Sequence, residues 1–219
     1  MLDRHEMAGF VRNAQIPNYS DGDGLVGINN RGELLVAPAV SPMAECVRQG
    51  RTWQCSIPTG SAFTHVAAWP TTRAELLLYN GEPSGGRSYV IESAWAANVA
   101  TSIAAASAYT LLGQVVASGA TPTDNTACLI TSRAGKGAYT GLAKKAIANT
   151  SYGIASQWEV LAAAPAGPAA SIGLAVIADI KGGIILPPGS LLLLNLIVGT
   201  ATGTACIGVV WSEVQLSLG

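Results

Sequence analysis

The sequence predicts an all-β fold, a β-sandwich or jelly roll preceded by an extended N-terminal arm. Nine apolar runs follow residue 60, and turn-forming residues occupy nearly every gap between them. None of these runs carries the one-sided apolar stripe of a long amphipathic helix, so short strands explain the pattern better. We therefore predict an arm over residues 1–60 and a sandwich domain over residues 61–219.

The last two apolar runs are the centre of this prediction. Pro187, Pro188 and Gly189 form a turn that a helix cannot cross, so the leucine-rich run that follows is predicted to be a strand. The run from Cys206 to Leu218 alternates like a second strand, and its composition suggests that both of its faces are covered. We expect the two strands to form a hairpin through residues 199–204.

The arm differs from the rest of the chain in composition. It holds turn-rich segments and only short apolar pieces, and one hairpin is predicted around Asn29, Asn30, Arg31 and Gly32. Segments of this kind become ordered by lying on a neighbour. Within the arm, the candidate anchors on such a neighbour are Leu34, Leu35 and Val36.

The other apolar runs are separated by turn signals such as Asn80-Gly81 and Lys181-Gly182-Gly183. The alanine-rich stretch from Ser93 to Ala106 favours a helix by propensity, but its large apolar residues do not form a helical stripe, so a strand is predicted. In chain order these runs are residues 63–69, 74–79, 89–99, 108–117, 127–130, 158–163 and 172–180.

The low content of charged residues indicates a surface that is covered by protein. Charged residues make up 11% of the chain and apolar residues 49%, whereas an ordinary soluble domain has about 25% charged residues. This deficit suggests a homo-oligomer or a larger assembly. A membrane span is not expected, because the long uncharged interval between Glu92 and Asp124 is mostly small and polar, and no export signal is visible.

No site for nucleic acid, metal or cofactor is expected. The basic residues are scattered, and their tightest group is Lys136 with Lys144 and Lys145. Cys46 and Cys55 flank a short loop and could form a disulfide, but four free thiols are the favoured interpretation in the absence of an export signal.

Catalytic and ligand-binding motifs are weak in this sequence. Residues 22–27 match GxGxxG but lack the preceding strand and following helix, and Asp21 and Asp23 fail the calcium-loop spacing. His5 and His65 are the only histidines, and neither has the setting of a catalytic triad. Exposed tryptophans could stack on sugars, although burial in the core or in a subunit contact is expected for most of them.

Three segments together resemble virion structural proteins of tailed bacteriophages. They read RGELLVAP in the arm, ELLLYNGEPSGGRSYVIESAWA in the middle, and GGIILPPGSLLLLNLIVGTATGTACIGVVWSEV near the end. The resemblance implies a jelly-roll or TNF-like domain that trimerises behind an extended arm. It also implies a capsid decoration (cement) protein, or alternatively a head-fibre or tail-knob component that binds a host receptor or glycan.

The expected function is therefore structural and non-enzymatic, with no cofactor. The expected partners are further copies of the chain in a homotrimer and the major capsid protein or another virion protein, with no direct contact to nucleic acid or membrane. The expected location is the capsid surface of the virion, after synthesis in the host cytoplasm. Leu192, Leu194 and Trp211, in the last two runs, are the candidate trimer contacts.

Overall fold

The computed structural model divides the chain into two compact units, residues 1–45 and residues 46–219, and we consider each by itself. In the first unit, strands β1 (Gly27–Ile28) and β2 (Leu34–Leu35) pair antiparallel, which confirms the predicted hairpin. Helix α2 (Pro42–Arg48) follows. The structure describes residues 27–28, 34–35, 42–58, 62–64, 66–71, 74–100, 108–117, 122, 126–135, 137–141, 143–150, 157–165, 175–199 and 203–216.

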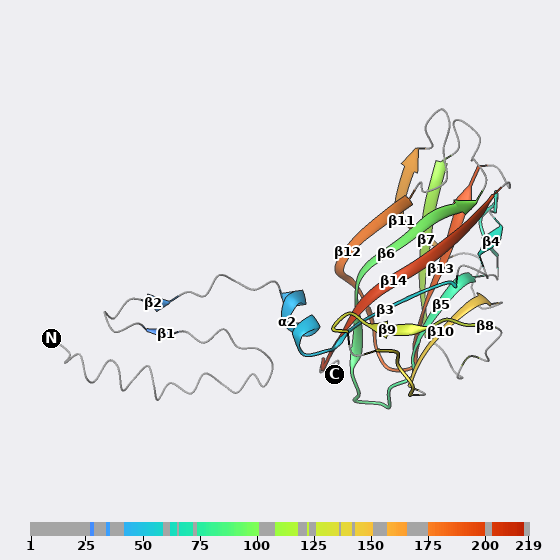
Figure 1. Ribbon diagram of the computed structural model, residues 1–219. Coiled ribbons are helices and arrows are strands. Elements are labelled where there is room, and N and C mark those ends of the chain that lie inside the picture. The colour runs from blue at the N-terminus through green and yellow to red at the C-terminus, as the bar shows by residue number, and fades with distance from the viewer. Residues whose placement is uncertain are drawn as a thin grey trace, which may run out of the picture. The chain divides into compact units, whose positions relative to one another are not determined.

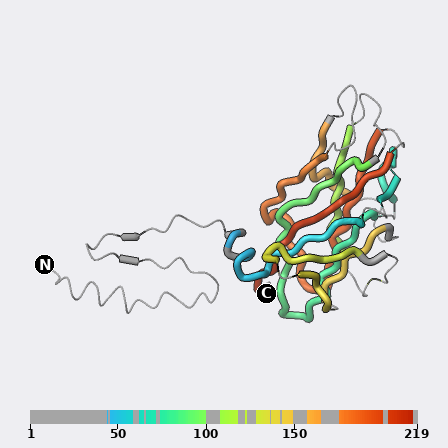
Figure 2. The backbone as a smooth tube through the Cα atoms, viewed as in Figure 1, coloured from blue at the N-terminus to red at the C-terminus, as the bar shows by residue number. Residues whose placement is uncertain are grey.

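The second unit is a sandwich of two antiparallel sheets (Figure 1), so the predicted all-β sandwich is confirmed. The finer jelly-roll or TNF-like assignment stays a prediction. The first sheet has the order β11-β7-β13-β5-β10-β8, and the second has the order β12-β6-β14-β3-β9, with β4 also pairing with β14. The chain passes repeatedly from one sheet to the other, and its path can be traced along the tube in Figure 2.

The strands of the first sheet are β5 (Ala74–Asn80), β7 (Ala108–Ala117), β8 (Thr126–Ala127), β10 (Lys144–Thr150), β11 (Glu159–Pro165) and β13 (Ser190–Val198). Those of the second sheet are β3 (Thr52–Ser56), β4 (Phe63–Thr64), β6 (Ser88–Ala100), β9 (Ile130–Ser132), β12 (Ala175–Leu186) and β14 (Thr204–Val214). The alanine-rich stretch after Ser93 is a strand as far as Ala100, as predicted. Its continuation to Ala106 lies outside the described residues.

The predicted hairpin between the last two runs is wrong, because β13 and β14 lie in different sheets. β13 pairs with β5 and β7, whereas β14 pairs with β3, β4 and β6. Stacked sheets lie about 10 Å apart, so a connection of a few residues can cross between them as easily as it can close a hairpin. The turn before β13 is as predicted, with Gly189 at φ 80° and the Ser190 N–H donating to Pro187 O at 3.1 Å.

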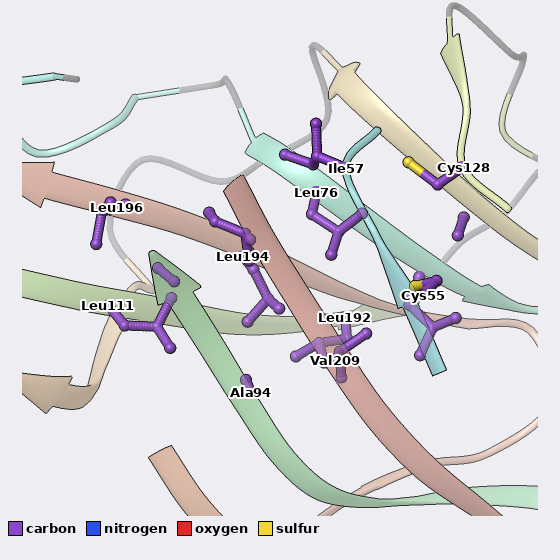
Figure 3. Close-up of a cluster of buried hydrophobic side chains, with 14 of the residues drawn as sticks. Cys55, Ile57, Leu76, Ala94, Leu111, Cys128, Leu192, Leu194, Leu196 and Val209 are labelled. Carbon is purple, nitrogen blue, oxygen red and sulfur yellow. The ribbon is translucent and has the colours of Figure 1, made fainter. Parts of the chain in front are cut away.

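The main core fills the space between the two sheets. Leu76, Leu192 and Leu194 of the first sheet face Ala94 and Val209 of the second (Figure 3). A second apolar cluster is separate from this core and includes Leu77, Leu112, Leu193 and Trp158. β13 is therefore buried on both faces, because Leu192 and Leu193 belong to different clusters and are both fully buried.

The predicted boundary at residue 60 is too late. β3, which the sequence analysis placed in the arm, pairs with β14 on one side and β9 on the other, so it is an interior strand of the second sheet. β10 was not expected as a strand, because it begins with two lysines. It nevertheless pairs with β5 along most of its length. In both strands, long-range pairing decides a conformation that the local pattern leaves open.

The Lys181-Gly182-Gly183 segment is a bulge inside β12, and not the turn that its composition predicted. The register with β6 shifts between Asp179 and Ile184, and both Lys181 and Gly182 have positive φ angles, 50° and 81°. Such a bulge lets an edge strand continue while it interrupts the ladder, which discourages edge-to-edge pairing.

Candidate functional site

The predicted arm contacts are only partly described. Leu34 and Leu35 form β2, paired with β1, and Val36 lies outside the described residues. Pairing with β1 gives this short apolar segment a defined extended backbone. Its role as a capsid contact stays a prediction.

The three predicted trimer contacts are wrong as contact residues. Leu192 and Trp211 are fully buried, and Leu194 is 1% exposed, within a single chain. All three belong to the core between the sheets. The sequence shows that these residues are apolar, but it does not distinguish a side chain that packs inside the sandwich from one that meets a second copy.

Several other sequence candidates fall where the structure does not describe them. These are His5, His65, Lys136, Asp21 and Asp23, together with most of the GxGxxG segment. Among the residues that are described, no group of three or more His, Cys, Asp or Glu side chains has the arrangement to hold a metal ion.

All four cysteines are free thiols in the structure, including Cys46 and Cys55. Cys55, Cys128 and Cys206 are buried, and Cys46 is half-buried. Burial raises the pKa of the Cys128 thiol to about 12. Burial, and to a smaller extent the nearby Cys128, raises the pKa of the Cys55 thiol well above its usual value. These thiols therefore stay protonated and behave as small core residues.

The tryptophans divide between core and surface. Trp211 and Trp158 are buried, as expected from their runs, whereas Trp53 and Trp95 are half-buried. Trp69 is 56% exposed. It is the tryptophan of this chain best placed to stack on a ligand.

The most distinctive polar site is a buried ion pair that joins the two sheets. Lys144 begins β10 of the first sheet, and Glu213 lies near the end of β14 in the second. Lys144 Nζ is 2.9 Å from Glu213 Oε1, and the two side chains are 6% and 2% exposed. Their attraction is strong in this poorly hydrated setting, and each charge compensates for the burial of the other.

Aromatic rings enclose the lysine of this pair. Its Nζ lies 4.2 Å from the ring centroid of Tyr139 and 5.0 Å from that of Trp53. Both distances are within the range of a cation–π attraction. Tyr89 stacks on Trp211 nearby, and burial and then the Glu213 carboxylate raise the pKa of its hydroxyl. The ammonium group is thus surrounded by groups that exclude water.

Asn80 completes the site from the neighbouring strand. It is fully buried, and it is the direct cross-strand partner of Lys144 in the ladder between β5 and β10. Its Nδ2 donates to the carbonyl oxygens of Arg87 and Leu186, both at 2.9 Å, and its Oδ1 accepts from the Glu82 N–H at 3.2 Å. These three bonds hold the carboxamide in one orientation.

The outer edge of the site carries two further charges. Glu82 Oε1 lies 3.9 Å from Lys144 Nζ, and Arg87 Nη1 lies 3.7 Å from Glu213 Oε2. Beside them is a cavity of about 330 Å³ lined by Glu82, Ser88 and the Pro187–Gly189 turn. Opposite charges are therefore balanced at this end of the sandwich.

Sequence reasoning did not find this site. Lys144 appeared only as part of a basic group, and Asn80 appeared only as a turn residue. The available signal was Glu213, a charged residue that interrupts an otherwise apolar strand. A buried charge of this kind requires a partner, but the sequence does not show that the partner comes from a strand about 70 residues earlier.

No helix among the described residues is long and apolar enough to cross a membrane. Comparison with protein-family models, with curated proteins and with solved structures gives no match. The fold and the site together define a class, an antiparallel two-sheet β-sandwich whose sheets are joined by a buried, aromatic-lined ion pair.

Proposed function

We propose that this chain is a structural protein of a tailed-bacteriophage virion that decorates and stabilises the capsid as a homotrimer. The observation that carries the proposal is a sandwich with large apolar side chains on its surface in a chain with only 11% charged residues. Surfaces of this kind are stabilised by contact with other protein. The sequence resemblance to phage virion proteins supplies the biological setting.

The outer face of the second sheet is the best-supported surface for contact between copies. Ile177 is 67% exposed and lies opposite Trp95 in the ladder between β12 and β6. A groove of about 370 Å³ next to Trp95 is lined by Pro58 and Leu129, and Leu129 is 62% exposed. These residues replace the buried Leu192, Leu194 and Trp211 as candidate trimer contacts.

Charge supports this assignment. Asp179 Oδ2 and Lys181 Nζ, on β12, are 2.9 Å apart and are both well exposed, so they largely neutralise each other. The net charge beside the proposed contact is therefore close to zero, so these charges do not make two copies repel each other there. In this proposal a trimer forms through this face, and the arm is left to grip the shell.

Co-sedimentation with capsids tests the function. The probe is the full-length chain incubated with capsids of the phage that encodes it, beside the double variant L34D/L35D. We expect the wild type to pellet with the capsids and the variant to stay in the supernatant with an unchanged circular dichroism spectrum. Absence of wild-type binding would refute the decoration role, and equal binding of the variant would refute the contact assigned to the arm.

A receptor- or glycan-binding knob of a phage fibre is the second candidate function. The exposure of Trp69 favours it, because an accessible indole ring can stack on a sugar. A glycan array probed with the wild type and with Trp69→Ala tests this alternative. Binding that requires Trp69 would support it, whereas an array without signal for the wild type would exclude glycan recognition.

A further inference from the structure

We propose that Lys144 and Asn80 become joined by an intramolecular isopeptide bond, with Glu213 carrying the protons. The inference concerns the interior of one chain and does not depend on the proposed virion role. Its basis is that Lys144 and Asn80 are both buried and directly opposite each other in the ladder, and that the Glu213 carboxylate lies 2.9 Å from the lysine amine. An ordinary ion pair needs only the amine and the carboxylate.

The register of the first sheet brings the two reacting residues together. Lys144 and Asn80 are directly opposite each other on the antiparallel strands β10 and β5. Side chains of such a pair share one face, and their Cβ atoms are about 5 Å apart. The flexible stem of lysine can therefore bring Nζ to the Asn80 carboxamide carbon.

A proton acceptor lies within reach of the buried amine. Asn80 and Glu213 are 0% and 2% exposed, and the rings of Tyr139 and Trp53 lie over Lys144 Nζ. A lysine amine must give up one proton before it can attack a carbon, and the proposed step therefore begins with transfer of that proton from Nζ to Glu213. Glu213 Oε1, at 2.9 Å from Nζ, is close enough to take that proton.

The hydrogen bonds of Asn80 suit attack at its carboxamide carbon. Oδ1 accepts from the Glu82 N–H at 3.2 Å, a bond that strengthens as negative charge develops on this oxygen. Nδ2 is held by the carbonyl oxygens of Arg87 and Leu186. The carbon is therefore presented in a fixed orientation, and the exclusion of water limits hydrolysis.

The step conserves atoms and electrons without an oxidant or reductant. The lone pair of neutral Nζ forms a bond to the Asn80 Cγ, and the Cγ–Nδ2 bond breaks. Glu213 carries a proton from Nζ to Nδ2, which leaves as ammonia, and the second Nζ hydrogen remains on the new amide. The products are one Lys144–Asn80 amide bond and one ammonia molecule. The ammonia takes the proton that Glu213 first accepted from the Lys144 ammonium and leaves as an ammonium ion, so Glu213 ends as the carboxylate.

The bond would join β5 to β10 and close the chain that carries β6, β7, β8 and β9 into a covalent loop. A cross-link across a long loop restricts the unfolded chain and so stabilises the fold. It would also hold these two neighbouring strands together under load. The buried site would therefore stabilise the sandwich covalently, in addition to pairing two buried charges.

Intact-mass spectrometry of the purified full-length chain under denaturing conditions is the test. We expect a mass lower than that of the sequence by one ammonia molecule, after correction for any N-terminal processing. Peptide mapping should then find one branched peptide that contains both Asn80 and Lys144. A wild-type protein with its full mass and an unmodified Lys144 would overturn the proposal.

Matched variants separate the bond from other sources of the same mass loss. Lys144→Arg and Asn80→Ala should both restore the full mass, whereas Lys145→Arg, at the adjacent residue, should retain the loss. Glu213→Gln should slow the loss while leaving both reacting residues in place. A loss that persists in Lys144→Arg would indicate a succinimide at Asn80-Gly81 and would overturn the proposal.

Discussion

Gly208 shows how one missing side chain shapes the surface of the second sheet. It lies opposite Trp95 in the ladder between β14 and β6, and a Cβ at this position would be 2.4 Å from Trp95 Cε2. The indole ring therefore lies directly over the glycine. Any larger residue at position 208 must push the ring away from the sheet.

We expect Gly208→Ala to destabilise the protein by about 1–3 kcal/mol, the usual cost of overpacking. Urea unfolding followed by circular dichroism measures this free energy. In a Trp95→Ala background the same substitution should cost much less, because the clashing ring is gone. An equal cost in both backgrounds would show that Trp95 is not the source of the strain.

The buried thiols predict a loss of stability at alkaline pH. The folded Cys128 has a pKa of about 12 and Cys55 a strongly raised one, while the unfolded thiols ionise near their usual value of 9.0. Above that value the unfolded state binds fewer protons than the folded state, so the free energy of unfolding falls as pH rises. The contribution of the protonated thiols to the free energy of unfolding is fully present below about pH 8.5. It is lost progressively as the pH rises towards the pKa of the folded thiols.

Urea unfolding between pH 8 and pH 11, on the wild type and on Cys128→Ala, measures this effect, with the pH range chosen around the usual thiol pKa. The variant should show a shallower decrease with pH, although it is less stable at every pH because it leaves a small cavity. Identical slopes would contradict a protonated buried thiol at position 128. Alkylation at neutral pH should label the half-buried Cys46 before the other three cysteines.

At the scale of elements, β3 determines how much of the N-terminal region can be removed. It lies between β14 and β9, and the Glu213 N–H also donates to Arg51 O just before it. Loss of β3 would leave β14, the strand that pairs with β3, β4 and β6, without its main neighbour on one side. The boundary at residue 60, which was predicted from composition, assigns β3 to the arm and so neglects its pairing with β14 and β9.

We expect a chain truncated before Pro42 to fold, and one truncated before Ser61 to aggregate or remain unfolded. Circular dichroism and size-exclusion chromatography of the two truncations distinguish these outcomes. The shorter deletion retains β3 and all of its pairing, so it serves as the matched control. A folded, soluble product of the longer deletion would show that the sandwich does not need β3.

Two elements explain what local patterns can and cannot predict. β7 was predicted with its observed bounds, because an apolar run with clear turn signals describes a strand directly. β10 was missed, because its opening lysines resemble a surface segment. One of them, Lys144, is in fact turned into the protein towards Glu213. The charge that weakened the prediction is the one that forms the candidate site.

At the scale of the whole molecule, the low charge content has two sources. Part of the deficit arises inside the protein. The first sheet contributes to the main core between the sheets, and it also contributes Leu77, Leu112 and Leu193 to a second, separate apolar cluster. The remainder is on the surface, in exposed residues such as Ile177 and Val160. Only this second part requires contact with other protein.

We expect light scattering to give a mass of three times 22.3 kDa for the wild type at micromolar concentration. Ile177→Asp should shift the mass towards that of one chain, because it places a charge in the proposed contact. Val160→Asp is the matched control, since Val160 is similarly exposed but lies on β11 of the first sheet. A monomeric wild type, or a trimer unaffected by Ile177→Asp, would contradict the proposed surface.

The amino-acid sequence by itself determined the all-β class, the short hairpin at Gly27–Leu35 and most of the strands of the sandwich. These follow from local physics, because side-chain alternation and turn residues act within a few positions along the chain. Only the tertiary structure decided that β13 and β14 lie in different sheets, that Lys144 is opposite Asn80 in the ladder, and that Lys144 pairs with Glu213. Strand partners are chosen by burial and pairing between distant segments, and the periodicity of one strand carries no information about its neighbour.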